Sequence, residues 1–352
     1  MFRFNPGGSS GNFLMTEIIK ENGNFTVPKD VSEITVTLFG GGGAGWKRNI
    51  GYGASSQEWL MASVGGGGGW MNKNTVKVTP GQIIPVVIGA GGLHNDTLNN
   101  CTAGGTSSFG TYLSANGGGA AHMIDYSYCA GSGGSGGGAF QPNGAIFGST
   151  YAGDGYQFGG GGLGGYARNG KAGNGGTWGG GGGISGAGIG IGGTYGGNGG
   201  SATNGKVVKA AEDGTNTMGN EELEKGFRGY GYGGDYGKNS SSYGGGGGGG
   251  YGGNGGKSNY ADWGGGGGGY GADGGNGPAG GGGGYSNKGK GGDGIYANYS
   301  SNYWVSIAGG GGGYGPGGSA AMPPQDGGGG AGHNNSVYAN GASGICIVQY
   351  YV

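Results

Sequence analysis

Glycine occupies 114 of the 352 positions of this chain, about a third, and much of it is gathered into runs. An ordinary globular protein contains roughly 7% glycine. Glycine has no Cβ, so its backbone can approach another backbone closely, but it brings no side chain to bury and loses much conformational freedom on folding. The glycine-rich part is therefore either disordered or held together by close packing of backbone against backbone.

The distribution of glycine and charge excludes several familiar classes of protein. Collagen needs glycine at every third position and abundant proline, whereas this chain has 9 Pro and continuous runs such as residues 244–250. RNA binding through Arg-Gly-Gly needs a cationic excess, but the net charge is -1 and no arginine is followed by two glycines. We expect no nucleic-acid partner. No stretch approaches 18 consecutive apolar residues, so we also expect no membrane insertion.

The segments before the glycine-rich part have the pattern of strands. Residues 34–38 alternate between aliphatic side chains and threonine, which predicts a half-buried strand. Residues 75–79 and 83–88 repeat this pattern on either side of Pro80 and Gly81, which favour a turn. This arrangement predicts a β-hairpin.

Two further strands are expected, at residues 106–115 and 344–352. The second is apolar on both faces, which predicts a central place in a sheet. Because strands at both ends of the chain must pair, we expect an all-β fold with almost no α-helix: a small antiparallel β-sandwich or jelly-roll frame that carries a large insertion. The expected parts are an N-terminal attachment segment (1–24), the frame (25–116), the glycine-rich insertion (117–340) and a strand that completes the frame (341–352).

The insertion holds 89 of the 114 glycines. We expect it to be an ordered bundle of left-handed polyglycine II helices, which have three residues per turn and a rise of about 3.1 Å. Such helices have no internal hydrogen bonds, so neighbouring helices must satisfy their N–H and C=O groups. Disorder is the alternative. The bundle is favoured because a structureless loop of this length is improbable inside a compact domain.

Five segments of the sequence together suggest a family. They are residues 23–43, 76–82, 87–92, 104–110 and 341–350, and they span nearly the whole chain. In this order they resemble the landmarks of the glycine-rich domain found in bacteriophage tail fibre and adhesin proteins. A similar glycine-rich sandwich occurs outside the cell in some receptor tyrosine kinases.

The resemblance implies a polyglycine II sandwich exposed on the surface of a virion, as a tail fibre tip or another appendage. Its partners would be a host cell-surface glycan or outer-surface protein, together with other virion proteins and, as one alternative, further copies of itself. It implies adhesion without catalysis. The alternative function is that of a purely structural or filament-forming glycine-rich protein, which assembles through exposed sheet edges.

The chain has little that indicates enzyme chemistry. Chance matches to dinucleotide-binding glycine patterns are frequent at this glycine content, and no nucleophile elbow is present. The acidic side chains are isolated, and we expect them to accept hydrogen bonds from loop backbone. The three cysteines form no metal-binding pair. Either Cys101 and Cys129 form a single bridge or all three are inert thiols, the favoured alternative. We expect no enzyme activity, no cofactor and no metal.

Aromatic side chains are the best candidates for binding. They either seal the glycine bundle or present flat faces to a receptor. If consecutive runs alternate in direction, loops 139–158, 184–195, 251–263 and 285–308 lie at one end, and 166–178, 201–243, 270–279 and 314–326 at the other. The first set contains the receptor-contact candidates Tyr151, Tyr156, Tyr296, Tyr299, Tyr303 and Trp304.

Overall fold

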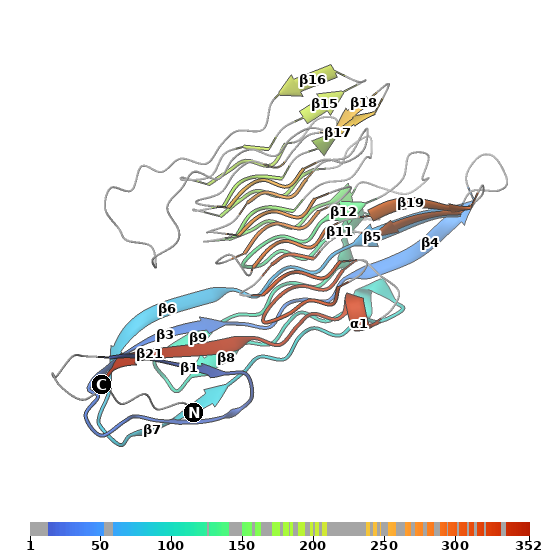
Figure 1. Ribbon diagram of the computed structural model, residues 1–352. Helices are drawn as coiled ribbons and strands as arrows, with labels where there is room; N and C mark the ends of the chain where they lie inside the picture. The colour runs from blue at the N-terminus through green and yellow to red at the C-terminus, as the bar shows by residue number, and fades with distance from the viewer. Residues whose placement is uncertain are drawn as a thin grey trace.

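The computed structural model in Figure 1 describes residues 13–52, 59–124, 127–140, 150–156, 159–162, 171–176, 179–182, 184–185, 189–193, 198–199, 201–203, 206–209, 237–239, 242–244, 247, 253–257, 265–268, 272–276, 280–284, 289–293, 295–300, 303–307, 310–312, 315–319, 322–331 and 336–352. The chain is 3% helix and 29% strand, which confirms the predicted all-β fold class. The helices in these ranges are the short α1 (Ser336–Ala339) and a 3-10 turn, η1 (Leu98–Asn100). No helix in these ranges is long and apolar enough to cross a membrane.

Two antiparallel four-stranded sheets form a sandwich at one side of the molecule. The first sheet has the order β1-β21-β3-β6 and the second β2-β7-β8-β9. Their bounds are β1 (Leu14–Ile19), β21 (Ile345–Tyr351), β3 (Glu33–Phe39), β6 (Met71–Lys77), β2 (Gly23–Thr26), β7 (Ile83–Val87), β8 (Ser107–Phe109) and β9 (Leu113–Ala115).

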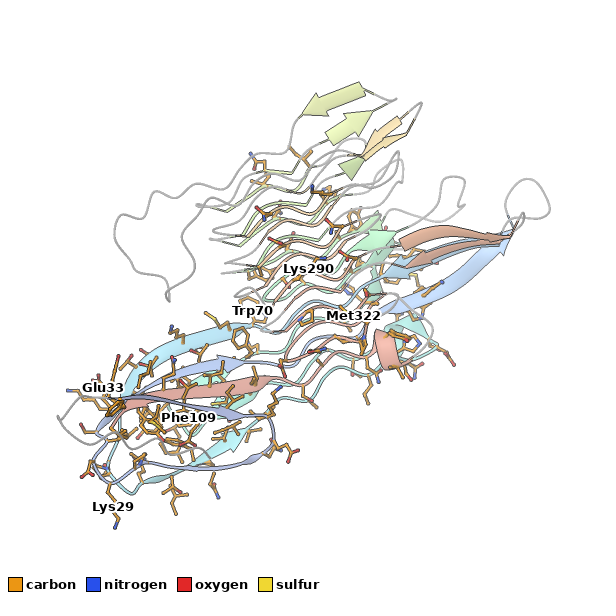
Figure 2. All side chains as sticks on the ribbon, in the orientation of Figure 1. Lys29, Glu33, Trp70, Phe109, Lys290 and Met322 are labelled. Atoms are coloured by element: carbon orange, nitrogen blue, oxygen red, sulfur yellow. The ribbon has the colours of Figure 1, made fainter. Side chains whose placement is uncertain are left out.

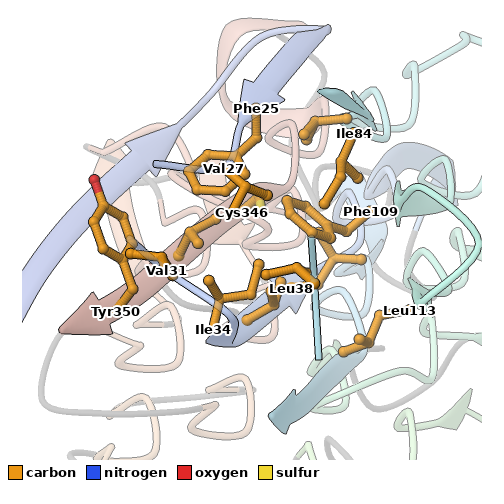
Figure 3. Packing of buried hydrophobic residues seen from close by; sticks show 14 of the residues in the cluster. Phe25, Val27, Val31, Ile34, Leu38, Ile84, Phe109, Leu113, Cys346 and Tyr350 are labelled. Carbon is orange, nitrogen blue, oxygen red and sulfur yellow. The ribbon is translucent and has the colours of Figure 1, made fainter. Parts of the chain in front are cut away.

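The core of the sandwich lies between the two sheets (Figure 3). The aliphatic residues of β3, namely Ile34, Val36 and Leu38, are at most 1% exposed, as their alternation predicts. Phe109 of β8 is fully buried, and its ring centroid lies 5.7 Å from that of Phe25. Burial of these large apolar side chains from both sheets holds the sandwich together.

The C-terminal strand β21 lies in the middle of its sheet, between β1 and β3, which confirms its predicted central place. The predicted attachment segment 1–24 is wrong in part, because β1 pairs with β21 along its whole length. The frame therefore begins at residue 14 at the latest. Residues 1–12 lie outside the described ranges.

Tyr350 of β21 joins β1 to the core. Its side chain is 6% exposed, and its hydroxyl donates a hydrogen bond of 2.5 Å to Oε1 of Glu17 on β1. Burial, followed by this hydrogen bond and the charge of Glu17, raises the pKa of Tyr350 from 10 to about 12. The folded protein thus holds the phenol proton more tightly than the unfolded chain does.

We expect Tyr350→Phe to reduce the loss of stability at alkaline pH. Since the folded pKa is raised, the contribution of Tyr350 to stability is complete below pH 10 and is lost as the pH rises through about 12. Chemical unfolding should find the wild type more stable than the variant at pH 8, with the two converging as the pH approaches 12. A constant difference at both pH values would contradict this assignment.

The predicted hairpin of residues 75–79 and 83–88 is wrong. The turn exists, with Gly81 at a φ of 77°, but β6 pairs with β3 while β7 pairs with β2 and β8. The segment between the two strands bonds to the connection that follows β2: Gly81 N donates to Val27 O and Val78 N to Ser32 O. These bonds separate the strands into opposite sheets.

The predicted strand 106–115 is instead two short strands, β8 and β9, joined by a tight turn. Gly110 in this turn has a φ of 51°, a conformation that favours glycine. The added Cβ of another residue would also lie within 3.0 Å of the Ile84 side chain.

Glycine-rich runs leave the strands of the sandwich and stack into a bundle (Figure 1). In the run 65–70, residues 65 and 68 donate to segment 135–138, residues 66 and 69 to 327–330, and residues 67 and 70 to 116–119. The run 40–45 behaves in the same way toward three other segments. Each neighbour is thus contacted at every third residue, which is the period expected of polyglycine II and differs from the period of two in a strand.

The runs are packed too closely for side chains. For most described glycines of the bundle, an added Cβ would lie within 3.0 Å of a backbone atom of a neighbouring run. This contact explains why glycine dominates the runs: alanine occurs in the bundle only at selected places, such as the buried Ala44, Ala172 and Ala331. The left-handed conformation of the individual runs stays a prediction.

The boundary predicted at residue 117 does not separate frame from bundle. The segments 40–45, 65–69, 89–92 and 102–105, all within the predicted frame, bond to one another and to later runs as bundle members. The strands and the bundle therefore share one continuous hydrogen-bonded structure.

Side chains of Asp and Asn link successive runs at the surface of the bundle. Oδ1 of Asp154 accepts a hydrogen bond from the backbone N of Asn174 at 2.7 Å, and Oδ1 of Asn174 accepts one from Ile191 N at 3.0 Å. Oδ1 of Asp293 and of Asp273 accept in the same way from Asn276 and Asn254. The predicted role of isolated acids as backbone acceptors is confirmed for these three aspartates.

The remaining strands are short or lie outside the sandwich. They are β4 (Trp46–Tyr52), β5 (Trp59–Val64), β10 (His122–Ile124), β11 (Ser127–Cys129), β12 (Ala139–Phe140), β13 (Thr150–Tyr151), β14 (Ile184–Ser185), β15 (Ser201–Thr203), β16 (Lys206–Lys209), β17 (Gly237–Asn239), β18 (Ser242–Gly244), β19 (Ile295–Ser300) and β20 (Tyr303–Ile307).

Candidate functional site

The bundle has two distinct ends. We call the end that joins β3 and β6 the sandwich end, and the end that joins β4 and β5 the hairpin end (Figure 1). At the hairpin end, β4 and β5 pair as an antiparallel ribbon, and β19 and β20 form a second ribbon. Strand β20 lies against β5, and Figure 1 shows both ribbons projecting together away from the bundle.

Four of the candidates predicted from the sequence lie on the second ribbon. Tyr296 and Tyr299 belong to β19, and Tyr303 and Trp304 to β20. In the register of the ribbon, Trp304 lies opposite Asn298, and the register shifts between Asn298 and Ser300. The backbone therefore gathers aromatic and amide residues within a few positions of the ribbon tip.

A fifth candidate, Tyr151, lies at the base of the same end. It is half-buried in β13, where it pairs with Cys129 of β11. Strand β13 is next to β12, and β12 pairs with β5. The structure thus brings Tyr151 to the hairpin end, below the projecting ribbons.

Tyr156 is separated from the other candidates. Residues 152–155 cross the bundle as a run, so the segment 139–158 is not a single loop at one end as predicted. Tyr156 is 42% exposed and stacks on Trp70, with ring centroids 4.7 Å apart and planes inclined by 12°. Figure 2 shows Trp70 at the sandwich end, where β6 leaves the bundle.

The second set of predicted loops also contains residues that cross the bundle as runs. Residues 171–176, 272–276 and 315–319 lie in runs that bond to neighbouring runs, although they fall inside predicted loops. Each run is interrupted by Asn, Asp or Pro, so its sequence does not have the continuous glycines from which runs were predicted. The predicted assignment of loops to alternate ends is therefore wrong in these places. Most of loop 201–243 lies outside the described residues.

An apolar cluster supports the hairpin end. Trp46 at the start of β4 is 2% exposed, and its ring stacks on Tyr128 at 5.8 Å. Its Nε1 donates to the carbonyl oxygen of Asp96 at 3.1 Å. The neighbouring Lys47 is partly buried, and burial lowers its pKa to about 8. The base of the hairpin end thus offers an amine that is only partly protonated near that pH.

A histidine and a cysteine meet beside this cluster. His94 Nδ1 hydrogen-bonds the carbonyl oxygen of Gly45 at 3.0 Å, and Sγ of Cys101 lies 3.9 Å from the same oxygen. Burial raises the pKa of Cys101, the reverse of what an activated nucleophile requires. Among the described residues, no three His, Cys, Asp or Glu side chains are placed to hold a metal ion.

The cysteines form no disulfide. Cys101, Cys129 and Cys346 are all free thiols, so the bridge left open by the sequence is not formed in the structure. Burial raises the pKa of Cys129, and that of Cys346 to about 12.

The first ribbon, β4 and β5, and the stacking of Tyr156 on Trp70 were not predicted from the sequence. A signal was present: Trp46 and Val64 directly adjoin glycine runs, and residues 59–64 are mostly apolar. Such an apolar stretch between two runs indicates a strand that continues from the bundle.

Comparison with known proteins adds no family. No protein-family model matches the chain, and no curated protein is significantly similar to it.

Proposed function

We propose that this protein is a non-catalytic adhesin on the surface of a virion, and that its hairpin end binds a host-surface glycan or outer-surface protein. The observation that carries the proposal is the pair of ribbons that project side by side from this end, with Tyr296, Tyr299, Tyr303 and Trp304 on one of them. The resemblance of the sequence to phage tail fibre adhesins supports the same function.

The chemistry of this end suits recognition. Aromatic rings supply rigid contact area at a low entropic cost, and neighbouring amides and hydroxyls supply hydrogen bonds. Asn298, Ser300 and Ser306 occupy positions on the same ribbon as the aromatic residues. A bundle closed by main-chain hydrogen bonds gives these ribbons a rigid base, which reduces the ordering cost on binding.

The double variant Tyr299→Ala/Trp304→Ala should lose receptor binding. Loss of two central aromatic residues commonly costs more than about 2 kcal/mol, so we expect the affinity to fall at least about tenfold. Binding of fluorescently labelled protein to an array of bacterial lipopolysaccharides and capsular polysaccharides, and to bacterial outer-membrane vesicles, measures this. Thermal unfolding should be nearly unchanged, because the ribbon lies outside the sandwich core.

Tyr112→Ala is the matched control. Tyr112 is 37% exposed on the sandwich, far from the hairpin end, and its replacement should leave binding intact. Unchanged binding by the double variant would reject the hairpin end as the receptor site. Failure of the wild type to bind any of these surfaces would instead favour the alternative of a purely structural protein.

A further inference from the structure

Strand β1 is an edge strand with one unpaired side. Within the described part of the chain, β21 is the only strand that pairs with it. Just before β1, Phe13 exchanges two hydrogen bonds with Val352, at 3.0 and 3.1 Å. Because such pairs alternate in an antiparallel ladder, residues 15, 17 and 19 also face β21, and the backbone N–H and C=O groups of Leu14, Thr16 and Ile18 point to the open side.

Among the described residues, the other edges of the sandwich carry protection against strand pairing that β1 lacks. Strand β6, at the opposite edge of the same sheet, carries Lys73 and Lys77, and the edge strands β2 and β9 have only 4 and 3 residues. Lysine and short length are devices that prevent edge-to-edge pairing. Strand β1 has 6 residues, LMTEII, and its one charged side chain, Glu17, already accepts the hydrogen bond of Tyr350.

On the outer face of β1, exposed aliphatic side chains lie on either side of Thr16. Leu14 is 52% exposed and Ile18 is 54% exposed, with Tyr351 of β21 beside Leu14 at 60%. Apolar residues that are this exposed along an unprotected edge strand mark a surface on which another strand can pair. From the contacts of β1 we infer that a second copy of this chain covers it, and that β1 pairs antiparallel with β1 of that copy to form a two-fold symmetric dimer.

Of the antiparallel registers that pair open groups with open groups, the one centred on Thr16 uses all of those on β1. These groups belong to residues 14, 16 and 18, so the two-fold axis passes beside Thr16: Thr16 lies opposite Thr16 of the second copy, and Leu14 opposite its Ile18. Three such pairs form about six intermolecular hydrogen bonds. The β1-β21-β3-β6 sheet of one copy and the same sheet of the second copy then form one continuous sheet across the dimer.

The side chains match in the same register, which is why a second copy fits this edge. Thr16, Gln349, Thr35 and Thr75 form one polar row across the sheet, in which Thr35 Oγ1 and Thr75 Oγ1 lie 2.9 Å apart. The dimer extends this row from Thr16 to Thr16. The rows on either side join Leu14 to Ile18, so apolar residues meet apolar residues, a favourable cross-strand pairing. Lys20, beyond the end of β1, is already paired with Asp326 at 2.8 Å.

The oligomeric state tests the inference. The subunit mass is 33.8 kDa, and light scattering at micromolar concentration should find twice this value for the full chain. Ile18→Lys places a charge at the pairing edge, so it should weaken the dimer at least about tenfold. Ile83→Lys is the matched control: Ile83 is 65% exposed on β7, and its replacement should leave the dimer intact.

Crosslinking tests the register separately. With Thr16→Cys, the two Cα atoms at the axis would be about 5.5 Å apart, within the range that a disulfide spans. This variant should form a covalent dimer under mild oxidation. Leu14→Cys should not, because the two copies of residue 14 are about 14 Å apart along the strands. The wild type controls for its native thiols.

Two results would overturn the inference. The first is a monomeric wild type; if a truncated form that lacks residues 1–12 then dimerised, the edge would be assigned to the chain's own N-terminal segment. A wild-type dimer that Ile18→Lys leaves intact, with no Thr16→Cys crosslink, would place the interface elsewhere. None of these results depends on receptor binding, so they are independent of the proposed adhesive function.

Discussion

Replacing Gly131 by alanine should prevent the bundle from folding stably. The added Cβ would overlap the carbonyl oxygen of Gly119 and lie within 3.0 Å of the backbone N of Gly67. Both atoms belong to runs that are themselves hydrogen-bonded, since Gly67 N donates to Gly119 O at 2.9 Å. A flexible side chain could move aside, but these backbones can yield only if several runs separate. We expect a loss of about 3 kcal/mol or more in the free energy of unfolding.

Thermal unfolding and limited proteolysis measure this effect. Gly23→Ala is the matched control, because nothing lies within 4 Å of a Cβ added at Gly23. The control should change stability by about 1 kcal/mol or less. Gly247→Val, whose Cβ would overlap the carbonyl oxygen of Gly266, should also become protease-sensitive. Equal protease resistance of the wild type and both bundle variants would refute close packing as the basis of the fold.

Replacing Trp46 by alanine should cause the second large loss of stability. Trp46 is 2% exposed and packs with Val64, Tyr128 and Ala139 in the cluster that supports the hairpin end. Truncation of a buried tryptophan to alanine costs about 3–5 kcal/mol. The loss should appear as a lower denaturation midpoint and as faster amide hydrogen exchange in β4 and β5.

Trp46→Phe separates packing from hydrogen bonding. Phenylalanine retains a ring to stack on Tyr128 but lacks the N–H that bonds to Asp96, so it should recover much of the stability. If Trp46→Ala were as stable as the wild type, this cluster would not support the hairpin end, and the ribbons would need another base.

The strands of the sandwich could be predicted because their signal is local. Residues 34–38 and the apolar C-terminal segment both form strands as expected. A two-residue period of apolar side chains indicates which face of a strand is buried. The pairing of β6 and β7 could not be predicted in the same way. Which sheet each strand joins depends on bonds to residues 27 and 32, and these are distant in sequence.

The candidate site was predicted in part for a similar reason. The aromatic residues of β19 and β20 could be grouped because they are neighbours in sequence. The position of Tyr156 could not, because it depends on whether residues 152–155 cross the bundle. That crossing depends on contacts with runs far away in sequence, which local composition does not reveal.

Because the runs of the bundle are closely packed, the codons for their glycines are constrained differently from the other codons of the gene. Every codon for glycine shares its first two bases, so any change in either base introduces a side chain or a stop, and in the packed runs that side chain meets another backbone. Glycines outside the packed runs escape this constraint, as at Gly23, where nothing lies within 4 Å of an added Cβ. Natural selection can therefore change positions outside the packed runs, in sequence and in length, while it holds the packed glycine positions fixed.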